Sequence, residues 1–147
     1  MKKSIVTDLI YIRQISEDVK QEELDSIVQD LKDSFPEKKA LGLTAIQIGI
    51  PKKVSIFKLP NQTDFMIIYN AKILEKLDPF RTVEGCLSIP GLTMETLRYA
   101  NITWINGDGQ TYSSEGIEAI VLQHEIDHME GKTILDRSFR KYNQNKK

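Results

Sequence analysis

The chain has 147 residues, about the size of one globular domain, and we expect a single domain over residues 1–147. Apolar residues make up 40 % of it and charged residues 28 %, which excludes a disordered, collagen-like or low-complexity protein. Its 20 basic and 21 acidic side chains nearly cancel, so the composition lacks the basic footprint of a nucleic-acid-binding protein.

The sequence pattern also bears on where the protein works. Asp8 and Arg13 interrupt the apolar segment that a secretory signal needs. The longest apolar runs, such as residues 65–69, fall far short of the roughly 20 residues that cross a bilayer. A single cysteine, Cys86, cannot form an intramolecular disulfide. We therefore expect a cytoplasmic protein without a membrane partner and, because no heptad repeat is present, a monomer.

Apolar residues at helical spacing predict two helices. The first covers Glu22–Phe35 and places its apolar stripe against the core. The second runs from about Glu115 to Met129, with Ser113 or Ser114 as its N-cap and Gly131 just past its end. The two helices are far apart in the chain, so strands are expected between them.

Stretches rich in β-branched and aromatic residues predict these strands. They are Leu43–Ile50, Lys53–Leu59, Phe65–Leu74, Leu92–Tyr99, Asn101–Asn106 and Gln110–Ser113. The turn Asn106-Gly107-Asp108-Gly109 predicts an antiparallel hairpin, because Asn and Gly tolerate the positive φ of tight turns. Runs of strands with two separated helices indicate an α+β domain of mostly antiparallel small sheets. Residues 137–147 are polar and basic, and we expect a flexible tail there.

The residues that carry chemistry lie in the second predicted helix, as His124-Glu125-Ile126-Asp127-His128. Residues four apart lie on one helix face, so both imidazoles can bind one metal ion between them. A carboxylate directly after the first histidine of such an HExxH site reaches a metal-bound water and acts as a general base, which is the role expected of Glu125. The alternative is that both histidines lie on the surface and bind no metal ion.

Two histidines do not complete a catalytic centre, since zinc-type centres usually have three protein ligands and one open position. The chain has no further histidine, and the position that would hold the third ligand of a metzincin is Ile134. Cys86, within Glu84-Gly85-Cys86-Leu87-Ser88, is the candidate third ligand because a thiolate binds borderline metals well. The alternative for a lone cysteine is a small buried apolar residue. One Cys and two His with an open position indicate hydrolytic chemistry.

Three segments together resemble the peptide deformylase family, in the family's order and with similar separations. They are Gly42-Leu43-Thr44-Ala45-Ile46-Gln47, Glu84-Gly85-Cys86-Leu87-Ser88 and His124-Glu125-Ile126-Asp127-His128. The resemblance implies a peptide-deformylase-like fold around the HExxH helix and hydrolysis of the formyl group from N-formylmethionyl peptides, with release of formate. The implied substrates are nascent formyl-Met polypeptides, met at the ribosome. A bacterial, organellar or viral source fits equally well.

The resemblance also implies a role for each matching residue. The implied ligands of one divalent metal ion, natively Fe(II) and replaceable by Zn, Ni or Co, are Cys86, His124 and His128. Glu125 takes a proton from the attacking water and delivers one to the departing amine. Gln47 through its side-chain amide and Leu87 through its backbone N–H donate hydrogen bonds to the oxyanion.

Five further residues are candidate substrate contacts. Gly42 permits close backbone approach, so a peptide could pair along the sheet edge that it opens. Ile117, Ile120 and Val121 lie on the metal-facing side of the helix, where their ordinary role is core packing. The resemblance implies that they line the pocket for the methionine side chain. It also implies that Arg98 lies beside the substrate backbone, with a generic exposed strand arginine as the alternative.

The sequence departs from the family pattern around its first segment. Ala40 stands where the family usually has glycine, and Thr44-Ala45 where it usually has Ala-Ala. Ala40 restricts φ, and the Thr44 hydroxyl needs a partner if it is buried. The resemblance therefore determines the metal site better than the shape of the substrate cleft.

Two other functions compete with deformylation. A zincin-type peptidase shares the two histidines and Glu125 but does not need Cys86. A catalytically silent relative that binds metal or peptide has no chemical need for Glu125 or Gln47. Because all of these residues are present, the sequence favours a metal-dependent deformylase.

Overall fold

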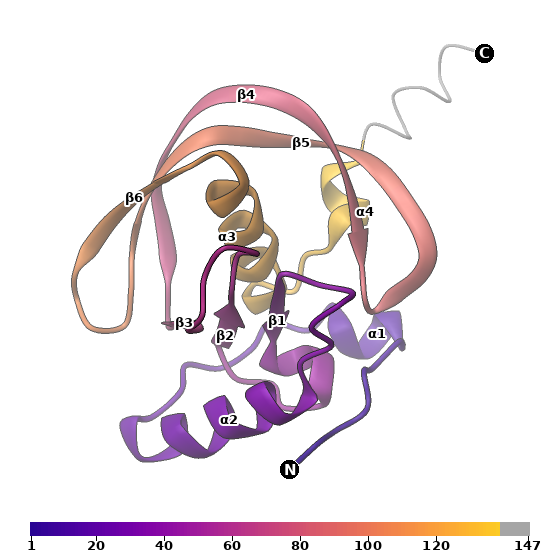
Figure 1. Cartoon of the computed structure of the whole chain (residues 1–147), viewed down its shortest axis with the longest axis vertical. Coiled ribbons are helices and arrows are strands. Elements are labelled where there is room, and N and C mark those ends of the chain that lie inside the picture. The colour runs from indigo at the N-terminus through magenta and orange to yellow at the C-terminus, as the bar shows by residue number, and fades with distance from the viewer. Residues whose placement is uncertain (139–147) are drawn as a thin grey trace.

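The structure is a computed structural model that describes residues 1–138. It has two three-stranded antiparallel sheets and a central helix, with smaller elements around them (Figure 1). In chain order the elements are α1 (Leu9–Ile12), α2 (Gln21–Ser34), β1 (Gly42–Thr44), the 3-10 turn η1 (Ala45–Ile48), β2 (Val54–Phe57), β3 (Met66–Tyr69), β4 (Lys72–Cys86), β5 (Ile89–Ile105), β6 (Thr111–Glu115), α3 (Gly116–Met129) and α4 (Ile134–Arg137). The predicted α+β class with small antiparallel sheets is confirmed.

The first sheet, in the order β1-β2-β3, packs against a helix on each face. Side chains of a strand alternate between its faces. Val54 and Ile56 of β2 accordingly join the core cluster that includes the buried stripe of α2, whereas Phe57 joins the cluster around α3. The helix predicted at Glu22–Phe35 is confirmed as α2, with its apolar residues on the core.

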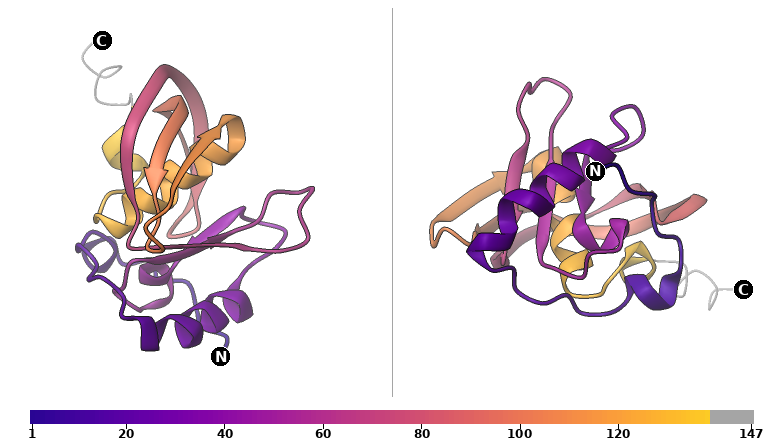
Figure 2. Two further views of the ribbon diagram at one scale, coloured as in Figure 1. Left: turned by 90° about the vertical axis from the view of Figure 1, so that its left-hand side faces the viewer. Right: turned by 90° about the horizontal axis from the view of Figure 1, so that it is seen from below.

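Helix α3 lies between the first sheet and the arch of the second sheet, where β4 and β5 curve over it (Figure 1, Figure 2). Because neighbours surround it, α3 buries residues all around its circumference instead of along one stripe. Trp104 of β5 is fully buried in the same cluster, and its indole N–H donates to Ser114 Oγ at 3.0 Å. The segment His124–His128 is thereby carried into the interior of the protein.

The predicted hairpin between β5 and β6 is confirmed, whereas the predicted N-cap is wrong. Gly109 has a φ of 81° and its N–H donates to the carbonyl of Asn106 at 2.9 Å, which closes the turn. Ser113 and Ser114 belong to β6, where Ser114 accepts the Trp104 bond, so neither caps the helix. Glu115 is the N-cap residue and α3 begins at Gly116.

The predicted strand Leu43–Ile50 is wrong after its first residues. Strand β1 ends at Thr44, and the chain then turns through η1 to Gly49, which has a φ of 86°. A short apolar run does not reveal whether it is strand or helix by its periodicity. The side-chain oxygen of Gln47 accepts the N–H of Thr44 at 3.0 Å and so holds this turn closed.

The remaining strands differ from prediction in their limits. The segment Phe65–Leu74 is interrupted at Asn70, whose φ is 48° and whose side chain bonds the backbone of Val19. Strand β4 then continues to Cys86 through a mostly exposed, charged stretch that shows no strand pattern. The two strands predicted at 92–106 form the single strand β5.

The end of the described chain contacts the rest of the protein. Arg137 ends α4, and its guanidinium bonds both carboxylate oxygens of Asp127, at 2.8 and 3.0 Å. Ser138 forms an isolated bridge with Thr96 of β5. The expected flexible tail thus begins with two residues that contact the rest of the protein, and residues 139–147 lie outside the described part of the chain. Within residues 1–138, no helix has both the length and the apolar character to span a membrane.

Candidate metal centre and catalytic site

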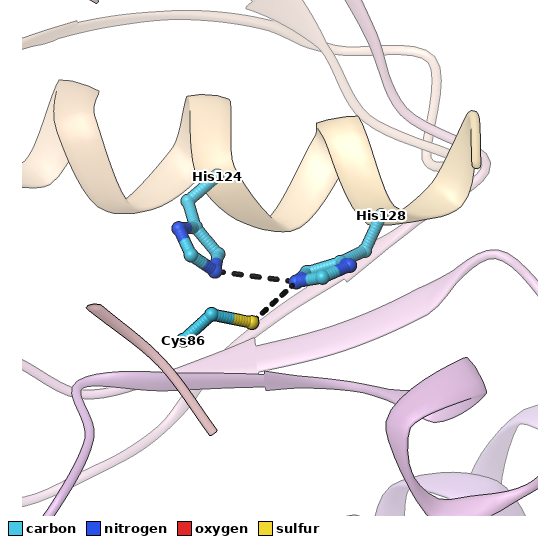
Figure 3. Close-up of side chains that lie close together, drawn as sticks. All are labelled: Cys86, His124 and His128. Atoms are coloured by element: carbon cyan, nitrogen blue, oxygen red, sulfur yellow. Dashed lines mark hydrogen bonds between the residues drawn. The ribbon is translucent and has the colours of Figure 1, made fainter. Parts of the chain in front are cut away.

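Three electron-pair donors meet beneath α3 (Figure 3). Cys86 Sγ, at the end of β4, lies 3.5 Å from His128 Nε2, which in turn is 3.2 Å from His124 Nε2. All ligand atoms of the group lie within 4.8 Å of one another. The helical spacing predicted that the two imidazoles would meet, and the structure brings the sulfur of Cys86 to the same point.

A buried carboxylate sets the orientation of the first histidine. Glu84 Oε1 lies 2.9 Å from His124 Nδ1. Burial alone would raise the pKa of Glu84, but hydrogen bonds from His124 and Arg98 hold it far below its usual range, so the carboxylate is ionised. An ionised carboxylate only accepts, and His124 Nδ1 is therefore the donor, so that in the neutral ring it is Nε2, on the side of the cluster, that has the lone pair.

The electrostatics of the cluster suit a cation. Burial, together with the charge of His124, lowers the pKa of His128 to about 3, so His128 is a neutral imidazole able to act as a ligand. Burial also opposes a positive charge on His124, yet hydrogen bonds with Cys86 and Glu84 raise its pKa well above the usual value. The surroundings of His124 thus favour a positive charge at this place, which a bound divalent ion would supply. The one-sulfur, two-nitrogen donor set fits Fe(II), Zn, Co or Ni.

A chain of buried ion pairs supports Glu84 from behind. Arg98 donates to both oxygens of Glu84, at 2.6 and 3.0 Å, and to Asp127 Oδ2 at 2.6 Å. Its exposed fraction is 2 %, and it does not line the cavity described below. The structure therefore contradicts the expected place of Arg98 beside the substrate backbone, because its guanidinium is occupied by two carboxylates. Asp127 also receives the two bonds from Arg137, which links α4 to the same chain.

Glu125 is buried beside the cluster against the edge strand β1. Its exposed fraction is 3 %, and its Oε1 lies 2.8 Å from the hydroxyl of Thr44. Burial raises the pKa of Glu125, while the charge of His124 and the Thr44 bond act in the opposite direction. The hydroxyl of Thr44 has the partner that its burial requires, at a distance typical of an O–H donor to a carboxylate.

The side-chain amide of Gln47 is fixed with its N–H groups toward the cluster. Because its oxygen accepts the Thr44 N–H, its Nε2 faces the other way, 3.3 Å from Ser88 Oγ and 3.8 Å from Cys86 Sγ. The turn that sequence periodicity missed is therefore what aims this amide.

A cavity of about 820 Å³ opens onto these groups. The side chains of Cys86, His124, Glu125 and Gln47 contribute to its wall. Leu87, the other predicted oxyanion donor, also lines it, as do the predicted substrate residues Gly42, Ile117, Ile120 and Val121. Ile117 is 60 % exposed, so α3 presents an apolar residue at the rim, with Val121 buried deeper. The volume is in the range of small-molecule sites.

Gly42 gives the first prediction. A Cβ at this position would lie 2.7 Å from Glu125 Oε2, closer than real contacts allow. Because Glu125 is the predicted general base, we expect Gly42→Ala to displace its carboxylate and lower kcat by about 100-fold, the cost of moving a reacting group by about 1 Å. The steady-state rate of the metal-loaded variant measures this, with metal content and thermal unfolding recorded alongside. Full activity in a folded variant would show that the carboxylate tolerates the shift.

A cluster of three donors, with a buried acid and an aimed amide on the wall of the adjoining cavity, is the arrangement of a metal-dependent hydrolase. Comparison with known proteins gives the family. A family model described as polypeptide deformylase matches residues 4–144. The peptide deformylase of Aquifex aeolicus is 34 % identical over 128 residues, which cover 82 % of this chain and 76 % of that protein.

Solved structures agree with this match. The peptide deformylase of Thermotoga maritima has a TM-score of 0.82 at 27 % identity, with 94 % of this chain and 98 % of that chain covered. A probable peptide deformylase from Synechococcus phage S-SSM7 has a TM-score of 0.81 at 31 % identity, with 92 % and 99 % covered. The chain belongs to the peptide deformylase family, whose members are metal-dependent enzymes, and the resemblance drawn from its three segments is confirmed.

Sequence reasoning left several residues of the site without a role. Glu84 was part of a recognised segment but was not singled out, although an acid two residues before a candidate ligand is a possible partner for an imidazole. Asp127 and Arg137 gave no signal, because their pairing depends on how α3, α4 and β5 pack. From the sequence, Thr44 is only a hydroxyl that needs a partner if buried, and the structure supplies that partner in Glu125.

Proposed function

We propose that this chain, acting as a single catalytic domain, hydrolyses the formyl group from N-formylmethionyl peptides and releases formate. The observation that carries the proposal is the cluster of the Cys86, His124 and His128 donors, of which Cys86 and His124 line one cavity together with Glu125 and Gln47. Each of these groups has a use in attack by water on a small carbonyl group.

The residues that would hold the metal are Cys86, His124 and His128. A bound divalent ion polarises the formyl carbonyl and lowers the pKa of water toward neutrality. We propose Fe(II) as the native ion, with Zn, Ni or Co able to replace it, since all four accept one sulfur and two nitrogens. Glu84 supports the site by fixing the tautomer and ring orientation of His124.

Glu125 is the proposed general base and then the general acid. Its carboxylate takes the proton that water loses as the oxygen attacks the formyl carbon. It then delivers a proton to the amine nitrogen as the carbon–nitrogen bond breaks. Its burial beside the donor cluster keeps the transfer distance short and bulk water away.

Gln47 and Leu87 are the proposed donors to the oxyanion that forms on the formyl oxygen. The Gln47 amide contributes Nε2, which is already aimed by the bond between its oxygen and Thr44. Leu87 contributes its backbone N–H from the turn between β4 and β5, next to Cys86. Such donors stabilise negative charge in the transition state without reorganising.

The rest of the cavity is proposed to bind the peptide. Ile117, Ile120 and Val121 form an apolar wall suited to a methionine side chain, and the edge at Gly42 allows a peptide to pair as an added strand. The proposed substrates are nascent formyl-Met polypeptides as they leave the ribosome, met by a monomeric enzyme in the cytoplasm.

The test is formate release from a formyl-Met peptide by protein prepared without oxygen and loaded separately with Fe(II), Ni, Co or Zn. We expect release with metal and none after a chelator removes it. The same peptide without its formyl group is the matched control substrate, and its internal bonds should stay intact. Protein with stoichiometric metal that releases no formate would refute the proposal. We also expect the Fe(II) form to lose activity in air faster than the Ni form.

A further inference from the structure

The edge strand β1 contacts both carboxylate oxygens of Glu125. Its residues 42 and 44 share one face, the face toward α3, because strand side chains alternate. Thr44 Oγ1 lies 2.8 Å from Oε1, and the missing Cβ of Gly42 leaves room for Oε2, which such an atom would approach to 2.7 Å. Oε1 therefore accepts a hydrogen bond from Thr44, whereas Oε2 lies beside Gly42, which has no side chain to contact it.

A second hydroxyl stands behind Thr44. Ser55 of β2 is the register partner of Thr44, so the two side chains lie next to each other on the same face. Their Oγ atoms are 2.7 Å apart, and both residues are fully buried. A hydroxyl donates one proton, and in the ionised state that a general base requires, the Glu125 carboxylate only accepts. The consistent direction of bonding is from Ser55 to Thr44 and from Thr44 to Glu125.

Thr44 also contacts the other proposed catalytic side chain, through its backbone. Its N–H donates to Gln47 Oε1 at 3.0 Å, and its hydroxyl lies 3.3 Å from the Glu125 carbonyl in addition to the carboxylate bond. A side-chain substitution at this position therefore removes the contact with Glu125 while the contact with Gln47 persists.

We propose that Thr44 is a positioning residue, whose hydroxyl, oriented by Ser55, fixes the carboxylate of Glu125 so that Oε2 is the oxygen that transfers the proton. The inference rests on the proposed role of Glu125 in deformylation. The terminal torsion of a glutamate is broad, so a carboxylate without such a bond samples many orientations. Holding one oxygen restricts the group to the geometry that the reaction needs.

The variant that isolates this hydroxyl is Thr44→Val, which keeps the shape of the side chain. We expect kcat for the formyl-Met peptide to fall by about 10- to 100-fold, with KM nearly unchanged and full metal content. Thr44→Ser should recover most of the rate because it retains the donor. Ser55→Ala should cost less than Thr44→Val and should add nothing to it, because Ser55 acts only through Thr44.

Ser114→Ala is the matched control for loss of a buried hydroxyl. Ser114 accepts the Trp104 bond on the second sheet, so its loss should lower thermal stability and leave kcat unchanged. If Thr44→Val alone does not fold, the pair Thr44→Val and Ser55→Ala replaces it, because it leaves no hydroxyl unpartnered.

Crystal structures of the metal-loaded wild type and Thr44→Val supply a readout that is independent of turnover. We expect the Glu125 carboxylate to rotate away from its wild-type orientation. A variant with wild-type kcat, or with an unmoved carboxylate, would overturn the inference. If the wild type itself releases no formate, the proposed function fails, while the orientation in the variant still decides whether Thr44 positions Glu125.

Discussion

Glu125→Gln should abolish most of the turnover while leaving the fold and the metal site intact. The amide keeps the shape of the side chain and an oxygen that can accept the Thr44 hydroxyl, which is 2.8 Å from Glu125 Oε1. It cannot take a proton from water. Loss of a general acid–base group lowers rates by about 100- to 10,000-fold, and we expect kcat to fall within that range.

The measurement is kcat for formate release at matched metal content. Glu118→Gln is the control, because it removes an acid from the same helix α3 at a position that does not line the cavity. We expect this control to keep the wild-type rate. A Glu125→Gln protein with more than about a tenth of the wild-type kcat would exclude Glu125 as the principal proton carrier.

Cys86→Ser should weaken metal binding and activity together. A thiolate is replaced by a hydroxyl that is harder and stays largely protonated, and we expect affinity for the ion to fall by about 100-fold or more. Elemental analysis after dialysis against graded metal concentrations measures the change. Unchanged stoichiometry and affinity would remove Cys86 from the ligand set.

The wild type offers an independent check, since Cys86 is its single cysteine. A ligated sulfur should react slowly with a thiol reagent, and a chelator should restore fast reaction because the free thiol is only partly buried. Equal rates with and without chelator would contradict the result expected from the serine variant.

The metal-binding residues could be predicted from the sequence more easily than the residues that pack around them. The spacing of His124 and His128 is enforced by a single helix, so local geometry alone predicted that they would meet. Cys86 could be proposed because the chain has no third histidine and a thiolate binds borderline metals well. Arg98 was placed wrongly because nothing in its own segment indicates that two acids from β4 and α3 enclose it.

The fold shows the same contrast between elements with strong local signals and elements that depend on their pairing partners. The long amphipathic helix α2 and the glycine-containing turn before β6 carry strong local signals and were predicted close to their limits. Strand β4 was missed over its charged part because its side chains there face solvent and its pairing with β5 supplies the order. The short turn η1 was missed because its closing bond comes from the side chain of Gln47, a local capping contact over three residues that apolar periodicity does not encode.

Strand β1 has only three residues, and its central one, Leu43, is fully buried in the core cluster with α2. A slip of one position in its pairing would turn Leu43 toward Glu125 and send Thr44 to the opposite face. The burial of the apolar Leu43 side chain on one face of the sheet therefore fixes the register that places Thr44 against Glu125 on the other face. The same three residues therefore serve both the packing of the core and the placement of Glu125. A change that shifts the register of β1 would disturb both.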